Sequence, residues 1–344
     1  MICFAWNEYP QYAARCIGAF VRATKEEVVV VATRPRIPIE GMEQLSGCRV
    51  VWIEANDTHS IDKLIGAMPS VLFVSGWAIP VFNHYRDQVR GSGGKVVAMC
   101  DNNFRFSLKE LLKAVRFRLL FRNKYDGYLV PGRSGIKLLR FYGVSPDRVR
   151  MGQYSADASI FNDGGVDICR RSKKIIFVGQ LCVRKNPLRL CVAFHASGAA
   201  KMGWTLDLYG CGPLRDRIPQ RDGISVHDFV QPEILAEKYR EARVFCLPSL
   251  KEHWGLVVHE AALSGCVLLL SDAIGAKEDL VGKSNGFVFS ATDSESLTMF
   301  LRQILSLSDG QLRAASAESV SLGRLISLST FADACQSFCM ERQG

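Results

Sequence analysis

Two glutamates, Glu252 and Glu260, stand eight residues apart where the sequence predicts a change from strand to helix. The surrounding residues 247–265 read LPSLKEHWGLVVHEAALSG. A strand is expected to end at Pro248 and a helix to begin near Gly255, so Glu252 lies in the loop and Glu260 about one turn inside the helix. Ligands of alternating strand-and-helix proteins bind at the carboxyl ends of the strands, where such loops lie. We therefore expect both glutamates to contact a ligand; the alternative is that they are solvated surface residues.

The start of this helix is also suited to an anion. The first backbone N–H groups of a helix, here those of Gly255, Leu256 and Val257, have no hydrogen-bond partner within the helix. They lie at the positive end of the helix dipole, and a glycine leaves room for a ligand beside the backbone. A diphosphate is the ligand that we expect these groups to bind.

Positive charge comes from a loop earlier in the chain. Residues 177–187 read FVGQLCVRKNP, in which a predicted strand is followed by Gly179 and Gln180 and then by the cations Arg184 and Lys185. Two adjacent cations after a strand can hold the phosphates of a ligand. The alternative is a solvated basic turn, since charged side chains are mostly exposed.

A glycine-rich turn follows the next predicted strand. Residues 208–214 read LYGCGPL and contain Gly210, Gly212 and Pro213. By itself a G-x-G-P turn is weak evidence of a ligand site, and only its place between the other two motifs favours one. A tight turn that needs glycine explains the same residues equally well.

Short apolar runs alternate with helix-sized segments in both halves of the chain. Such alternation predicts parallel sheets with helices on both faces. Two series of this kind predict an α/β protein with two Rossmann-like domains that face a central cleft. In the first half, strands are expected at residues 1–6, 28–32, 49–53, 71–74, 95–99 and 128–130, and helices at 13–23 and 108–122. In the second half, strands are expected at 175–178, 205–209, 224–227, 244–247 and 267–270, and helices at 232–242 and 256–264.

A polar stretch separates the two series. Residues 162–167 read NDGGVD and are followed by RRSKK at 170–174, a composition typical of a linker. We therefore expect one domain over residues 1–162 and a second over 172–324. The remaining segment, 325–344, has a helical pattern.

The motifs of the second domain resemble the donor site of the family 4 retaining glycosyltransferases (glycosyl transferases group 1). Residues 247–265 are similar to the pattern P-S-x-x-E-x-W-G-L-V-V-x-E-A, and residues 177–187 are similar to V-G-R-L-x-x-x-K-G/N, with Gln180 in place of the usual arginine. The resemblance covers roughly the whole second domain and is thinner in the first. It implies the GT-B architecture, in which segment 325–344 would cross back to the first domain.

The resemblance also implies roles for single residues. Glu252 would contact the hydroxyls of the transferred sugar, Glu260 the ribose of the nucleotide, and Lys185 with Arg184 the donor diphosphate. Lys185 and Glu252 are thus the expected catalytic residues. No metal ion or other cofactor is expected, and the six histidines and twelve cysteines show no metal-ligand spacing. The other expected donor-binding residues are Gly179, Gln180, Gly210, Gly212, Pro213, Gly255, Leu256 and Val257.

The acceptor side is expected in the first domain. The family's glycine-rich first loop is replaced by WNEYP at residues 6–10, which makes Asn7 and Tyr9 candidate contacts. Asp101 follows a predicted strand, where many relatives place a histidine near the reacting sugar. A helix cap or a turn is the alternative role for Asp101.

The expected reaction is the transfer of a sugar, with retention, from a nucleotide-diphosphate sugar to a glycan or lipid-linked acceptor. A UDP- or GDP-sugar is the favoured donor, and cell-surface polysaccharide synthesis the favoured role. The alternative is a non-catalytic nucleotide-sugar- or glycan-binding partner of another glycosyltransferase, which Gln180 and the atypical residues near Asp101 motivate.

Basic residues are concentrated in one segment of a chain whose net charge is +9. Residues 105–150 hold twelve Lys and Arg against three acidic residues. A basic amphipathic helix binds anionic lipid, which predicts peripheral membrane contact through this segment; the alternative is a helix packed on the core with a solvated charged side. Nucleic acid is not expected, because the segment has no recognised binding motif. The apolar residues at helical spacing are Leu108, Leu111, Leu112, Val115 and Leu119.

The sequence also bears on location. No uncharged apolar run approaches the roughly 18 residues that cross a bilayer, and the N-terminus shows no signal-peptide pattern. The cysteines are scattered without a C-x-x-C pair, which favours a reducing compartment. We expect a cytoplasmic protein in peripheral contact with the inner face of the membrane.

Overall fold

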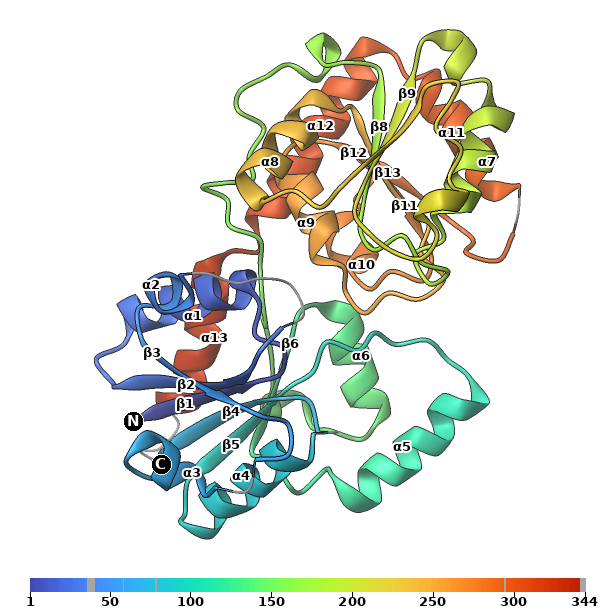
Figure 1. The fold of residues 1–344 in the computed structure, drawn as a ribbon. Coiled ribbons are helices and arrows are strands. Elements are labelled where there is room, and N and C mark those ends of the chain that lie inside the picture. Colours follow the sequence, from blue (N-terminus) through green and yellow to red (C-terminus); the bar gives the residue numbers. More distant parts are fainter. Residues whose placement is uncertain (36–40, 58, 78, 294, 341–344) are drawn as a thin grey trace. The chain divides into compact units, whose positions relative to one another are not determined.

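The chain forms two compact units (Figure 1). The first combines Met1–Ser155 with Ser327–Gly344, and the second is Ala156–Ile326. The chain therefore passes between the units twice, after Ser155 and after Ile326. The computed structural model describes residues 1–35, 41–57, 59–77, 79–293 and 295–340.

The first unit is built on a parallel sheet. Within the described residues this sheet has seven strands in the order β3-β2-β1-β4-β5-β6-β7. Strands such as β2, with the sequence VVVVAT, are buried along their whole length, as is typical of a parallel sheet covered on both faces. The strands are β1 (Ile2–Trp6), β2 (Val28–Thr33), β3 (Arg49–Ile53), β4 (Val71–Ser75), β5 (Lys95–Met99), β6 (Gly127–Val130) and β7 (Val149–Met151).

Helices connect these strands. They are α1 (Gln11–Ala23), α2 (Met42–Ser46), α3 (Ile61–Ile65), α4 (Pro80–Gly91), α5 (Leu108–Leu120), α6 (Arg133–Phe141), the 3-10 helix η1 (Pro146–Arg148) and, from the end of the chain, α13 (Leu328–Met340).

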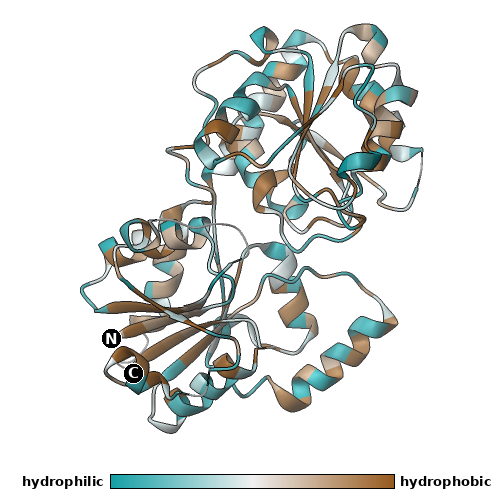
Figure 2. Cartoon of the chain, viewed as in Figure 1, coloured by the Kyte–Doolittle hydropathy of each residue, from teal (hydrophilic) through white to brown (hydrophobic). Residues whose placement is uncertain are grey.

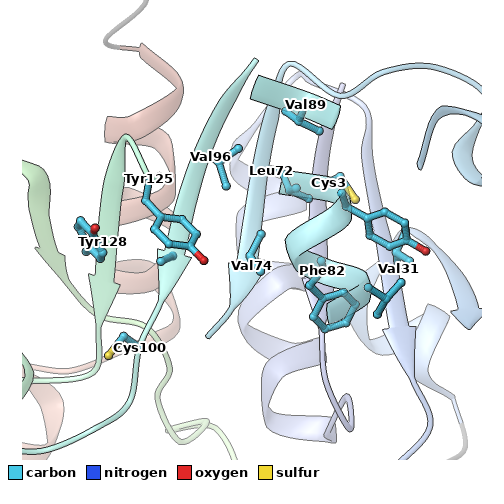
Figure 3. Close-up of a cluster of buried hydrophobic side chains, with 14 of the residues drawn as sticks. Cys3, Val31, Leu72, Val74, Phe82, Val89, Val96, Cys100, Tyr125 and Tyr128 are labelled. Carbon is cyan, nitrogen blue, oxygen red and sulfur yellow. The ribbon is translucent and has the colours of Figure 1, made fainter. Parts of the chain in front are cut away.

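Alternate residues of the strands fill two core layers. Phe4 of β1 stacks on Phe73 of β4, with ring centroids 4.7 Å apart. The intervening positions point to the opposite face of the sheet. There, Leu72 and Val74 lie among the buried residues that include Phe82 of α4 (Figure 3).

The terminal helix α13 belongs to the first unit, where it packs on α1 (red among blue elements in Figure 1). The ring of Phe331 lies 5.9 Å from that of Phe4, and the Gln336 side chain donates a hydrogen bond of 2.7 Å to the Ala23 carbonyl. The first core is thus completed by residues far away in the sequence.

The second unit is built on another parallel sheet. Its described strands number six, in the order β10-β9-β8-β11-β12-β13. The strands are β8 (Lys174–Val178), β9 (Thr205–Tyr209), β10 (Ile224–His227), β11 (Val244–Leu247), β12 (Val267–Ser271) and β13 (Gly286–Phe289). The helices are η2 (Ile168–Arg170), α7 (Pro187–Ser197), η3 (Ala200–Met202), η4 (Arg215–Arg217), α8 (Pro232–Glu241), α9 (Leu256–Leu263), α10 (Lys277–Leu280), α11 (Ser296–Leu305) and α12 (Asp309–Arg324).

The prediction of two Rossmann-like domains is confirmed. In both units the strands are largely hydrophobic and the helices carry mixed faces (Figure 2). The sequence patterns miss the edge strands β7 and β13, which are short and only partly buried. The run VRM of β7 gives a weak apolar signal because it is short and interrupted by a charge, whereas the apolar run GFVF of β13 could have been predicted.

The observed boundaries differ from the predicted limits 1–162, 172–324 and 325–344. The polar residues 162–174 lie inside the second unit, which begins at Ala156. The buried guanidinium of Arg171 holds this stretch in place, because it donates to the carbonyl oxygens of Ala242 at 3.3 Å and Ser264 at 2.8 Å. The polar residues 162–174 are therefore a segment bound to the second unit and are not the linker between the units.

Candidate functional site

The strand order of the second sheet reverses between β8 and β11. From β8 the sheet continues to β9 and β10, and from β11 it continues to β12 and β13 on the other side. Ligands of open α/β sheets bind at the carboxyl ends of the strands at such a reversal. The loop after β8 carries Lys185, and the loop after β11 carries Glu252.

These two loops bring Lys185, Arg184 and Glu252 together. The Lys185 ammonium donates a hydrogen bond to Glu252 Oε2, and Arg184 Nη1 lies 3.4 Å from the same oxygen. The Ser249 hydroxyl donates to it as well, at 3.4 Å. Lys185 and Glu252 are buried, and a buried charge requires partners of this kind. Two cations share one carboxylate, which leaves positive charge for an anionic ligand.

Backbone hydrogen bonds fix the loops that carry this cluster. The Leu250 N–H donates to the Arg184 carbonyl at 2.8 Å, and the Glu252 N–H donates to the Ala273 carbonyl at 3.4 Å. Asn186 adopts a left-handed conformation, φ +57°, directly before the proline that begins α7. The cations therefore stand at the last two positions before the turn into a helix.

The predicted glycines serve a close contact between the loops after β8 and β9. Gly210 has φ +145°, and a Cβ there would lie 2.1 Å from the Gly179 carbonyl oxygen. A Cβ on Gly212 would lie 2.5 Å from the Leu181 carbonyl oxygen. Only glycine fits at these two positions, so the close approach of the two loops explains why the predicted turn contains glycine. The neighbouring Gln180 and Pro213 are exposed.

Helix α9 begins where the sequence predicts it. Gly255 precedes Leu256 in a left-handed conformation with φ +97°, and no side chain caps the first turn. A Cβ on Gly255 would lie 3.3 Å from Glu252 Cγ, so the helix start adjoins the ion cluster. The first N–H groups of α9, including those of Leu256 and Val257, are therefore close to the cations of the preceding loops.

Glu260 lies one turn farther along α9 and contacts Tyr239. The buried Tyr239 hydroxyl donates to Glu260 Oε2 at 3.2 Å. Burial raises the pKa of the Glu260 carboxyl to about 7, although the hydrogen bond from Tyr239 opposes this shift. A carboxyl that titrates near neutrality is typical of a functional site and uncommon elsewhere.

His259, which the sequence patterns did not single out, is fully buried beside Glu260. The Ala156 N–H donates to its Nδ1 at 3.0 Å, and its Nε2 lies 2.8 Å from the Gly323 carbonyl oxygen. Nε2 must carry the proton, because a carbonyl only accepts. Burial lowers the pKa of His259 to about 4, so the ring is neutral at pH 7. A histidine inside the apolar run LVVHEAAL was the available signal.

The three predicted acceptor residues lie at the carboxyl ends of β1 and β5 in the first unit. Asn7 is exposed, and its Oδ1 accepts a hydrogen bond from the Thr33 hydroxyl at 3.1 Å. Asp101 is partly exposed. Tyr9 is fully buried, with its ring centroid 6.0 Å from that of Trp6 and 6.3 Å from that of Trp52. The prediction for Tyr9 is therefore corrected: its aromatic ring is a core residue, which its place in a polar-looking loop concealed.

Metal ligands and membrane-spanning helices are two further features that bear on function. Among residues 1–340 apart from the undescribed gaps, no three His, Cys, Asp or Glu side chains are grouped so that they could hold a metal ion. In the same part of the chain, no helix has both the length and the apolar character needed to span a membrane.

Comparisons with known proteins agree with this architecture. Residues 172–307 match the family model described as glycosyl transferases group 1. No curated protein matches the chain in sequence. Among solved structures, sucrose-phosphate synthase from Thermosynechococcus elongatus is similar with a TM-score of 0.72 and 15% identity, covering 100% of this chain and 99% of that chain.

Two further solved structures have the same fold. A glycosyltransferase from Rickettsia africae ESF-5 has a TM-score of 0.76 at 10% identity, covering 100% of this chain and 99% of its own. Anabaena HepE, solved in complex with UDP and glucose, has a TM-score of 0.75 at 13% identity, covering 98% of each chain. At such identities the structural likeness establishes the fold alone, which is the GT-B fold for the whole chain, and the match to the glycosyl transferases group 1 is confined to residues 172–307.

Proposed function

We propose that this protein transfers a sugar, with retention of configuration and without a metal ion, from a nucleotide-diphosphate sugar to a glycan or lipid-linked acceptor. A UDP- or GDP-sugar is the favoured donor, and cell-surface polysaccharide synthesis the favoured role. The observation that carries the proposal is the buried pair of Lys185 and Glu252, joined by Arg184, where the strand order of the second sheet reverses. The complex of HepE with UDP and glucose on the same fold supports this choice of donor.

The cluster is suited to the charge that develops when a sugar leaves a diphosphate. As the glycosidic bond breaks, negative charge grows on the diphosphate, and the Lys185 ammonium and Arg184 guanidinium can stabilise it. The first N–H groups of α9 add the positive end of a helix dipole. These groups would do the work that Mg²⁺ does in other transferases.

Glu252 has a second role in this proposal. Its carboxylate is oriented by Lys185, Arg184 and Ser249, and in this proposal it accepts hydrogen bonds from the sugar hydroxyls. In a retaining reaction the acceptor attacks from the face of the leaving group, and a donor phosphate oxygen takes its proton. No side chain is therefore assigned as a general base.

The test is a panel of UDP-, GDP-, ADP- and dTDP-sugars, offered to the purified protein with EDTA present. We expect one donor to raise the melting temperature and to be hydrolysed slowly, with release of its nucleotide. Binding without any turnover, even with candidate glycan and lipid-linked acceptors, would favour the non-catalytic partner. Activity that disappears with EDTA and returns with Mg²⁺ would refute the metal-free mechanism.

Two substitutions separate the roles of the cluster. Lys185→Gln should lower kcat by about 100-fold or more, because a positioned positive charge on the diphosphate is lost. Glu252→Gln should weaken the contribution of the donor sugar to binding, but it should not weaken the affinity for the free nucleotide diphosphate, because Lys185 and Arg184 lose a competing carboxylate. Matched controls are Lys201→Gln and Glu237→Gln, at exposed positions of the same unit. Equal activity of Glu252→Gln and Glu237→Gln would refute the site assignment.

A further inference from the structure

Helix α5 of the first unit turns an apolar stripe outward. Leu108 is 79% exposed, Leu112 71%, Leu119 78% and Val115 48%. At about 100° per residue these four positions fall within about 60° of one another around the helix axis. Phe106, just before the helix, is 72% exposed. Single exposed leucines are ordinary, but a contiguous stripe of this kind marks an interaction surface.

The opposite side of α5 is anchored to the core. Ala114 and Phe117 are buried, and the Phe117 ring lies 5.2 Å from Trp77 and 5.0 Å from Tyr142. The Arg118 guanidinium donates to the Phe141 carbonyl at 2.8 Å. The helix is therefore held firmly by one face, and the outward stripe is a second apolar face that the fold does not use. Packing on the core accounts for Ala114 and Phe117 but does not account for the exposed apolar residues of the stripe.

Cations lie beside the outward stripe. Residues 105–124 hold seven Lys and Arg against one acidic residue, Glu110, whose carboxylate is paired with Lys113 at 3.0 Å. At helical spacing Lys109 and Arg116 fall on one side of the stripe, and Arg122 follows directly after the end of the helix. All three are exposed. Mixed apolar and polar turns are visible along this helix in Figure 2.

We propose that the stripe of Phe106, Leu108, Leu112, Val115 and Leu119 docks on an anionic lipid bilayer, with α5 lying in the plane of the headgroups. The aliphatic stripe would enter the boundary between headgroups and acyl chains, and the flanking cations would reach the lipid phosphates. Leu108 and Leu119 are separated by about 17 Å along the axis at 1.5 Å per residue. Such a length suits a helix that rests on a membrane and is too short to cross one.

Other occupants fit the surface less well. A second copy of residues 105–124 would bring seven cations against seven, which repel one another. Nucleic acid would contact the cations but gain nothing from four aliphatic side chains at the centre of the face, because its bases stack on aromatic residues. An anionic bilayer alone satisfies both the apolar stripe and the charges beside it.

The proposal goes beyond the proposed activity, since docking can be measured without donor or acceptor. The full-length protein is sedimented with phosphatidylcholine vesicles, with and without phosphatidylglycerol, at low and high salt. We expect binding only to the vesicles with phosphatidylglycerol, and weaker binding as salt screens the charges.

Two double variants test the two parts of the surface. Leu112→Gln with Leu119→Gln should weaken vesicle binding about 100-fold, about tenfold for each leucine removed from the bilayer. Lys109→Gln with Arg116→Gln should weaken it about 25-fold at low salt, about fivefold for each cation. The matched controls are Val192→Gln on α7, where the side chain is 68% exposed, and Lys201→Gln with Arg221→Gln. All of these positions are exposed, so the substitutions should leave the core intact. Equal melting temperatures of the variants and the wild-type protein would establish that all are folded.

The outcomes are distinct. Loss of vesicle binding in both α5 variants, with the controls unchanged, would support the docking surface. The proposal is overturned if the wild-type protein ignores anionic vesicles at low salt, or if the leucine variant binds them as well as the wild type does. Tight binding of a duplex oligonucleotide that depends on the cations but not on the leucines would assign the surface to nucleic acid instead.

Discussion

The pKa of Glu260 makes donor binding depend on pH in a defined direction. The pKa of this carboxyl is raised to about 7 by burial. The ionised carboxylate accepts strong, charge-assisted hydrogen bonds from ribose hydroxyls through both oxygens, whereas protonation turns one oxygen into a donor and removes the charge. If Glu260 binds the ribose, donor affinity should rise with pH, because the ionised fraction grows from about one tenth at pH 6 to about nine tenths at pH 8. The expected change in affinity is therefore about tenfold.

Isothermal titration calorimetry with a nucleotide-diphosphate sugar measures this change. Both phosphates of such a donor are esters that stay ionised between pH 6 and pH 8, so the ligand adds no slope of its own. Binding at pH 7 should release about half a proton, which titrations in buffers of different ionisation enthalpy reveal. Glu260→Gln should abolish both the slope and the proton release, and should lower affinity about tenfold at pH 8 because a charge-assisted hydrogen bond becomes neutral.

Two results would refute this reasoning. The first is an affinity that stays constant, or falls, between pH 6 and pH 8 in the wild-type protein. The second is a slope of the expected size that persists in Glu260→Gln, since another group would then be titrating. Glu237→Gln, at an exposed position on α8, is the control for loss of a carboxylate from the same unit.

Further predictions concern stability. The pKa of His259 is lowered to about 4, so its contribution to the free energy of unfolding is complete above the unfolded pKa near 6.5 and is lost as pH falls through 4. Glu260 behaves in the opposite way. Its contribution is complete below the unfolded pKa near 4.5 and is lost as pH rises through 7. A tenfold change in proton affinity corresponds to about 1.4 kcal/mol, so the loss of stability at each end of the pH range amounts to about 3 kcal/mol. Denaturant unfolding across pH should show that His259→Gln removes only the loss at acid pH. An unchanged loss at acid pH in that variant would contradict the assignment. Gly210→Ala should destabilise the second unit by about 2 kcal/mol or more, because the new Cβ would lie 2.1 Å from the Gly179 carbonyl oxygen. Gly198→Ala is the matched control, with φ +81° and open space around the added atom, and it should cost about 1 kcal/mol from backbone strain alone; equal losses in the two variants would exclude the close contact as the cause.

Much of the second unit could be predicted from local patterns. The start and end of α9 follow from Gly255 and Gly265, because glycine tolerates the left-handed conformations that both ends require. The buried strands follow from short apolar runs between turns. The sequence also places Lys185 and Glu252 after strands, and parallel strands end at one edge of the sheet, but their direct pairing depends on β8 and β11 being neighbours.

Other features depend on contacts between distant residues. Helical spacing in residues 108–122 predicts an apolar face, yet α5 has two: Ala114 and Phe117 face the core, and Leu112 and Leu119 face outward. Periodicity alone gives the same signal for both. Tyr9, which follows β1, is buried because the sheet brings Trp52 of β3 beside it, and no local pattern records that contact.

The sequence by itself determined the two alternating series of strands and helices, the glycines that shape the turns, and the residue types at the candidate donor site. Those properties depend on backbone preferences and on charge, which act over a few residues. Only the tertiary structure decided that α13 completes the first core, that His259 binds Ala156 and Gly323, and that the leucines of α5 are left outside. Each of these depends on which distant surfaces meet, because burial is a property of the folded whole and not of the segment that is buried.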